Sequence, residues 1–179
     1  IGALAGFSNT TAGNNTAVGY SAMTANTTGA NNCAFGLNAL SVNTTGTENH
    51  SSGYATLSNN TTASYNTAVG ARALTANTTG ANNTATGYRA LLANTTANSN
   101  TAVGMYALTS NTTGANNNAL GYQGLNSNTT GGYNVAIGNA ALYANTTASN
   151  NTAVGYATLL ANTTGTGNTT SGFESLKSN

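Results

Sequence analysis

The chain has 179 residues, of which 3% are charged, and its formal net charge is +1. Globular domains carry about 25% charged residues, so this composition argues against an ordinary domain with a thick core. The near-zero charge gives no electrostatic basis for binding nucleic acid or an anionic membrane, and no stretch approaches the roughly 18 apolar residues of a membrane span.

Glycine recurs at every seventeenth position of the chain without a slip. A fixed period without insertions predicts one small structural unit stacked on itself in a line. The array runs without interruption over residues 1–179, and neither end carries a capping element. We therefore expect a single repeat domain that is a window of a longer fibre. The glycine column consists of Gly2, Gly19, Gly36, Gly53, Gly70, Gly87, Gly104, Gly121, Gly138, Gly155 and Gly172.

The repeating unit is defined on residues 15–31, NTAVGYSAMTANTTGAN, whose positions are numbered 1 to 17. Asn and Thr dominate the composition, with 32 and 35 residues, but apolar residues recur at fixed positions. Regular order is therefore favoured over a disordered polar tract. Position 1 is always Asn, which predicts a ladder of side-chain amides along the axis. This ladder consists of Asn15, Asn32, Asn49, Asn66, Asn83, Asn100, Asn117, Asn134, Asn151 and Asn168.

Positions 2 to 6, which read TAVGY in the first copy, alternate as a β-strand does and are rich in β-branched and aromatic residues. A second short strand or bend is expected at positions 8 to 10. The NTTG segment that begins at position 12 has turn chemistry. Strands stacked about 4.8 Å apart would pair with their copies. We therefore predict an all-β fold, a β-solenoid (β-roll or β-helix) of about ten 17-residue coils.

Two columns of the unit are mainly apolar, with Ser or Thr in some copies of position 4, and both are expected to form continuous buried stripes. Position 4 holds residues such as Val18 and Phe35, and position 9 holds Met23 and then Leu in every later copy. Which face of the strand points inward stays open. Position 6 is Tyr in alternate copies, which indicates a 34-residue superperiod from either duplication or an alternating contact along the fibre. These residues are Tyr20, Tyr54, Tyr88, Tyr122 and Tyr156.

The run NTAVGY, followed by AL and NTTG, resembles the short repeats of YadA-type trimeric autotransporter adhesin heads. It is still more similar to the NTAxGYxAL repeats of tail-fibre-like proteins. The resemblance covers the whole chain, although the repeats of adhesin heads are shorter. It implies a β-roll or β-solenoid at a cell or virion surface, with three chains side by side in a homotrimer.

The Asn-Thr-Thr triplet at positions 12 to 14 fits the N-x-[ST] acceptor pattern for glycosylation. A glycan on an exposed turn would keep a nearly uncharged fibre dispersed. The alternative is a structural ladder of stacked amides with Thr beside them. Modification on Asn or Thr and a bare ladder both stay open. The candidate acceptors are Asn9, Asn26, Asn43, Asn60, Asn77, Asn94, Asn111, Asn128, Asn145 and Asn162.

A flat β-solenoid with rows of Thr is also similar to antifreeze proteins, which use Thr-x-Thr on a strand. In this chain the triplet threonines are adjacent, as at Thr27 and Thr28. Their side chains would point to opposite sides of a strand, which disfavours ice binding.

Residues for catalysis or metal binding are scarce, so we expect no enzyme activity, no metal site and no cofactor other than covalent glycan. The chain has one Cys, one His and no Asp. Cys33 and His50 occupy position 2 of successive copies and would stack about 5 Å apart. This pair could be a nucleophile or, with Glu48, part of a metal site. Chance variation in a variable column is the interpretation we favour.

Position 7 places Arg72 and Arg89 in adjacent copies. Stacked like charges repel, which predicts solvent-facing side chains rather than an anion site. A receptor-binding fibre would gather variable residues on one face, and position 7 is the best such column. It includes Ser21, Asn38, Arg72, Arg89, Tyr106 and Gln123.

The sequence favours a structural protein of an extracellular fibre or filament, assembled from copies of itself and glycan-coated if the triplets are modified. The alternative is the shaft or head of an adhesin or phage-type tail fibre that binds a surface glycan or receptor. An ice-binding protein is third. We expect no nucleic-acid partner and no membrane insertion of this segment.

Overall fold

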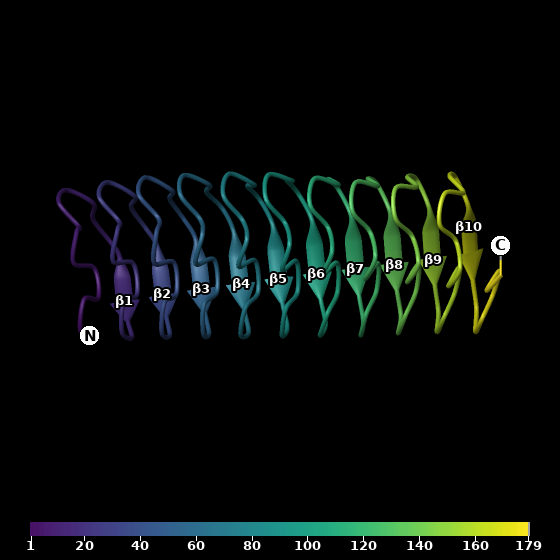
Figure 1. The fold of residues 1–179 in the computed structure, drawn as a ribbon, viewed down its shortest axis with the longest axis horizontal. Coiled ribbons are helices and arrows are strands. Elements are labelled where there is room, and N and C mark those ends of the chain that lie inside the picture. The colour runs from purple at the N-terminus through teal and green to yellow at the C-terminus, as the bar shows by residue number, and fades with distance from the viewer. Residues whose placement is uncertain (179) are drawn as a thin grey trace.

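The coils of the chain stack in a single row to form a solenoid (Figure 1). The computed structural model describes residues 1–178, and within them it contains ten strands and no helix. All strands are parallel and belong to one sheet, in which each strand pairs with the next along the chain. The predicted all-β solenoid of 17-residue coils is therefore confirmed. The strands are β1 (Thr16–Val18), β2 (Cys33–Phe35), β3 (His50–Ser52), β4 (Thr67–Val69), β5 (Thr84–Thr86), β6 (Thr101–Val103), β7 (Asn118–Leu120), β8 (Val135–Ile137), β9 (Thr152–Val154) and β10 (Thr169–Ser171).

The register keeps every column of the repeat in line. Ala17 pairs with Ala34 between β1 and β2, and each later pair of strands is offset by the same single repeat. Hydrogen bonds between coils continue outside the strands: Leu74 N–H donates to the Ala90 carbonyl at 3.0 Å, and other turns do the same. The segment at positions 8 to 10 is thus a hydrogen-bonded bend rather than a second strand.

The core is a thin column of small residues and leucines. Position 9 is fully buried, as Leu108 illustrates with 0% exposure, and Ala at positions 3 and 8 packs beside it. The expectation that position 4 is also buried is wrong, because Val103 is 38% exposed. Only the middle residue of a three-residue strand points inward, and the residues on either side of it point outward. Ala at this middle position leaves room for the leucines of the opposite wall.

Sharp corners keep each coil short. Residues other than Gly adopt positive φ at positions 7, 9 and 17 of most copies, as in Arg72 (φ 60°), Leu74 (φ 51°) and Asn82 (φ 59°). Such conformations cost about 1–3 kcal/mol each. Burial of the Leu side chain at position 9 contributes about 1.5–3 kcal/mol in the opposite direction. The corners therefore depend on stacking, which buries that column.

Candidate functional surfaces

The asparagines of the Asn-Thr-Thr triplet form an amide ladder inside the coil. Asn94 Nδ2 donates to Asn77 Oδ1 at 2.9 Å, and Asn111 Nδ2 donates to Asn94 Oδ1 at 3.1 Å. The second hydrogen of Asn94 Nδ2 goes to the Ala97 carbonyl in its own coil at 3.1 Å. Both donors of the amide are therefore satisfied within the protein, and its oxygen is too. The same links run from Asn9 to Asn162.

The second asparagine column, at position 1, forms a ladder of a different kind. Asn83 Oδ1 accepts the backbone N–H of Asn100 at 3.0 Å, and Asn83 Nδ2 donates to the Ala97 carbonyl at 2.9 Å. Asn94 donates to that same carbonyl, so one backbone oxygen in each coil joins the two ladders. The side-chain amides of the two columns thus stabilise the Asn-Thr-Thr turn from inside the coil.

Of the two alternatives that the triplet leaves open, this geometry favours the structural ladder over glycosylation of the asparagines. From Asn26 to Asn162 their side chains are buried at 0–1% exposure, and Nδ2 is the atom that a glycan would modify. Asn9 is exposed, and its Nδ2 donates to the Ala12 carbonyl at 3.0 Å. The second Thr of the triplet is the accessible part: Thr79, Thr96 and Thr113 are exposed, and no side-chain hydrogen bond involves them within residues 1–178.

The glycine column is a structural requirement of the stacking. Gly104 has φ 133°, and a Cβ built on it would lie 2.4 Å from the backbone oxygen of Gly121 in the next coil. Residues with a side chain rarely adopt this φ, and the backbone of Gly121 cannot move aside as the end of a flexible side chain could. Glycine therefore permits the close approach of successive coils at this corner.

An apolar stripe runs along the outside of the sheet. It is formed by the outward-pointing position 4 and by position 6, and neither column contains a charged residue. The large residues that are exposed at these positions range from 36% exposure (Val154) to 75% (Phe173). The exposed large residues of the apolar stripe are Tyr20, Phe35, Leu37, Tyr54, Val69, Tyr88, Val103, Met105, Leu120, Tyr122, Ile137, Val154, Tyr156 and Phe173.

The sheet also presents Thr and Val side by side on its outer face, which reasoning on the triplet missed. Thr101 at position 2 and Val103 at position 4 flank the inward-pointing Ala102. The alternation in T-A-V was the signal that could have found this Thr-x-Val pair. The rows are irregular, because Cys33 and His50 interrupt position 2.

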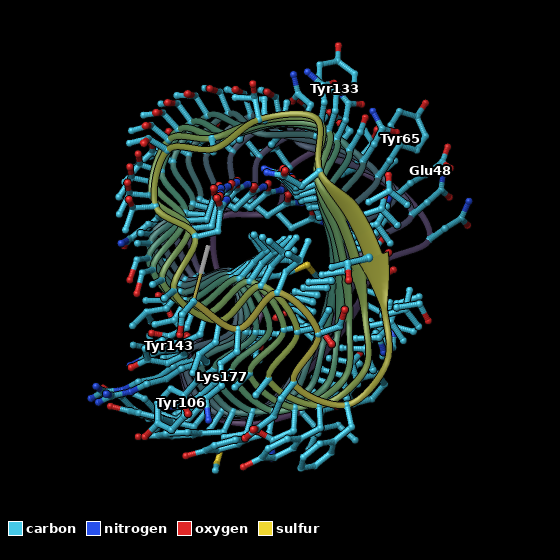
Figure 2. All side chains as sticks on the ribbon, turned by 90° about the vertical axis from the view of Figure 1, so that its right-hand side faces the viewer. Glu48, Tyr65, Tyr106, Tyr133, Tyr143 and Lys177 are labelled. Atoms are coloured by element: carbon cyan, nitrogen blue, oxygen red, sulfur yellow. The ribbon has the colours of Figure 1, made fainter. Side chains whose placement is uncertain are left out.

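Cys33 and His50 are neighbours in register on β2 and β3, as their spacing predicts. His50 is exposed and lies 6.4 Å from the Phe35 ring, measured between centroids. Glu48 belongs to another face, beside the tyrosines at position 17 (Figure 2). No three potential metal ligands come together anywhere in residues 1–178.

Position 7 forms a corner at which arginine and tyrosine gather. Arg72 Cζ lies 5.9 Å from the centroid of the Tyr54 ring, and Arg89 Cζ lies 5.2 Å from that of Tyr88. Tyr106, in the next coil, makes edge contacts with Tyr88 at 5.5 Å and with Tyr122 at 6.4 Å. Arg72 is exposed as expected, whereas Arg89 is half-buried.

The described part of the chain has no surface pocket, and no helix in it could span a bilayer. No protein-family model, curated protein or solved structure matches the chain. Function therefore has to be argued from the surfaces described above.

Proposed function

We propose that the chain is a structural segment of an extracellular fibre, and that copies of it pack side by side through the apolar stripe. The observation that carries this proposal is the length of the stripe, which has no charged residue from β1 to β10 and is apolar except at Ser52, Thr86, Asn139 and Ser171. Single exposed apolar residues are normal on a protein surface, but a large contiguous patch marks an interaction site.

A second copy of the chain is the partner that suits this surface. Tyr, Phe and Met are enriched in interface cores and charged residues are depleted, which is the composition of the stripe. The partner must also offer contacts at the spacing of the coils, about 4.8 Å. A copy of the same chain has that spacing throughout. The arrangement of three chains implied by the adhesin-like repeats is one closed form of such packing.

Charged substitutions in the stripe test the proposal. We expect the unaltered chain to sediment as an oligomer or to form laterally packed rods in negative-stain micrographs. The double variant V103K/V154K should be a monomer, because lateral packing would bury two unpaired charges. The control T96K/T147K adds the same charge at the same three-coil spacing on the exposed Thr of the triplet, and it should assemble normally. A monomeric unaltered chain at high concentration would overturn the proposal.

Ice binding is a second candidate, which the Thr-x-Val pairs of β1, β4, β6 and β9 favour. It competes with lateral packing, since both use position 4. A thermal-hysteresis measurement on the V103K/V154K monomer and on the unaltered chain separates them. Ice binding requires hysteresis from the unaltered chain and its loss in the variant.

A further inference from the structure

We propose that the position-7 corner around Arg72 and Arg89 binds a linear acidic polysaccharide through the carboxylates of its uronic acid residues. These are the only two arginines of the chain. They stand in adjacent coils, each with a guanidinium over a tyrosine ring. A guanidinium held over a ring does not need its N–H donors for that contact, so its terminal N–H groups can bind a carboxylate with two parallel hydrogen bonds.

Within the part of the chain that the structure describes, both arginines lack a protein partner for their charge. Within residues 1–178 neither guanidinium donates a hydrogen bond to the protein, and Arg89 Nε is buried without an acceptor. Leaving a buried donor unsatisfied is unfavourable. A bound carboxylate removes that penalty, because it accepts a hydrogen bond from Nε once the Arg89 side chain moves outward. The sequence-based expectation of a merely solvated pair does not account for this unmatched donor.

The acidic residues of the chain lie too far away to compensate these charges. Glu174 shares the position-7 column but is five coils from Arg89, and Lys177 Nζ already pairs with it at 2.7 Å. Glu48 lies at the corner of the coil opposite to Tyr106 (Figure 2). Within residues 1–178 the Arg72–Arg89 corner therefore brings two side-chain positive charges together without a compensating acid, and it attracts an external anion.

The spacing of the corner favours a linear polymer over a single small anion. Arg72 leans back over Tyr54, whereas Arg89 stays over Tyr88, so the two guanidiniums are aimed at rings two coils apart. Two coils correspond to about 9.6 Å along the axis. Small Ala71 lies between them, and the region has no pocket that could enclose a compact ligand. An extended chain with repeated carboxylates can reach both.

The tyrosines favour a sugar polymer over other polyanions. The exposed rings of Tyr54 and Tyr88 offer apolar surface next to the charges, against which the C–H groups of sugars can pack. Nucleic acid binding draws its affinity from many neutralised phosphates, and two arginines supply few. The strands of the sheet also pair with one another along its whole length, so an acidic peptide finds a free strand edge only at the ends.

Fluorescence polarisation with a labelled oligogalacturonate tests the site, with K177Q as the matched control. R72Q, R89Q and K177Q each remove one positive charge. Gln123 occupies the same column, so Gln fits the backbone there. We expect R72Q and R89Q each to weaken binding about tenfold, and K177Q to leave it unchanged. R72K/R89K should also weaken binding, because lysine keeps the charge without the fork.

Several outcomes would overturn the proposal. The unaltered chain could fail to bind the oligogalacturonate, K177Q could lose as much affinity as R72Q and R89Q, or a neutral galactan could bind as tightly as the oligogalacturonate. Equal binding of polyglutamate would assign the site to acidic peptides instead, and equal binding of single-stranded DNA would reduce it to general charge attraction. Thermal melting monitored by circular dichroism checks that each variant retains the fold. The measurement can be repeated in the V103K/V154K background, where R72Q and R89Q should each still weaken binding about tenfold, so the test does not depend on lateral packing.

Discussion

Single asparagine side chains connect the coils of this protein. Replacing Asn94 with Ala leaves Asn77 Oδ1 without its donor and one hydrogen of Asn111 Nδ2 without its acceptor, both in the interior. We expect Asn94→Ala to lower the free energy of unfolding by about 3 kcal/mol, measured by denaturant titration. The control Thr96→Ala alters an exposed side chain and should stay within about 0.5 kcal/mol. Equal stability of both variants would contradict the ladder.

An acid at the same site should make stability depend on pH. Asn94→Asp keeps the shape of the side chain but places a carboxyl group where the amide is fully buried. Burial raises the pKa of this carboxyl in the folded state above its unfolded value of about 3.9. The variant should therefore be most stable below the unfolded pKa, and it should lose stability as the pH rises through the folded pKa. Melting temperatures from acidic to neutral pH check this, with the unaltered chain as reference.

At the scale of the coil, two glycine columns should respond differently to the same substitution. Gly104→Ala forces Cβ into the Gly121 backbone at a positive φ and should destabilise the protein by about 3 kcal/mol. Gly114→Ala also meets a close backbone oxygen, at 2.3 Å. However, its φ is not in the left-handed region, and Ala97 fills the same position one coil earlier. We expect Gly114→Ala to melt close to the unaltered chain.

The stacking of the coils could be predicted from the period of the sequence, but the side of each strand that faces the core could not. The spacing of Gly104 and its equivalents, together with the TAVGY alternation, is enough to derive stacked parallel strands and the buried leucines. The direction of Val103 could not be derived, because alternation reads the same from either face. Turn chemistry placed Asn94 at an exposed turn. The side chain turns inward because its amide satisfies the backbone oxygen of Ala97 and both neighbouring amides.

Only part of the candidate binding corner could be predicted from the sequence. Arg72 and Arg89 share a column of the repeat, so their proximity follows from counting. The divergence of their side chains toward Tyr54 and Tyr88 depends on the corner geometry at position 7. Neither this geometry nor the unpaired Arg89 Nε follows from residue spacing.

Across the whole molecule, a coil should be removable as a unit. Deleting residues 83–99 joins position 17 of one copy to position 1 of another and keeps every column aligned. We expect this variant to fold with the same circular dichroism spectrum and to be shorter by about 4.8 Å in small-angle scattering. Deleting residues 83–98 removes one residue less than a full repeat, so the columns on the two sides of the junction are out of register by one residue. That variant should melt at a markedly lower temperature, since repeat stability depends on the contacts between neighbours.

The constant register also has a consequence for how fast such a chain folds. Each strand pairs with its copy one repeat further along the chain, whether it lies in β2 or in β9. The entropy lost on closing one coil is therefore the same at every step and does not grow with the length of the array. Relative contact order therefore falls as coils are added. Formation of the first pair of coils is the slow step, and later coils add to it more quickly. Duplication of one unit therefore lengthens the rod without making its folding harder.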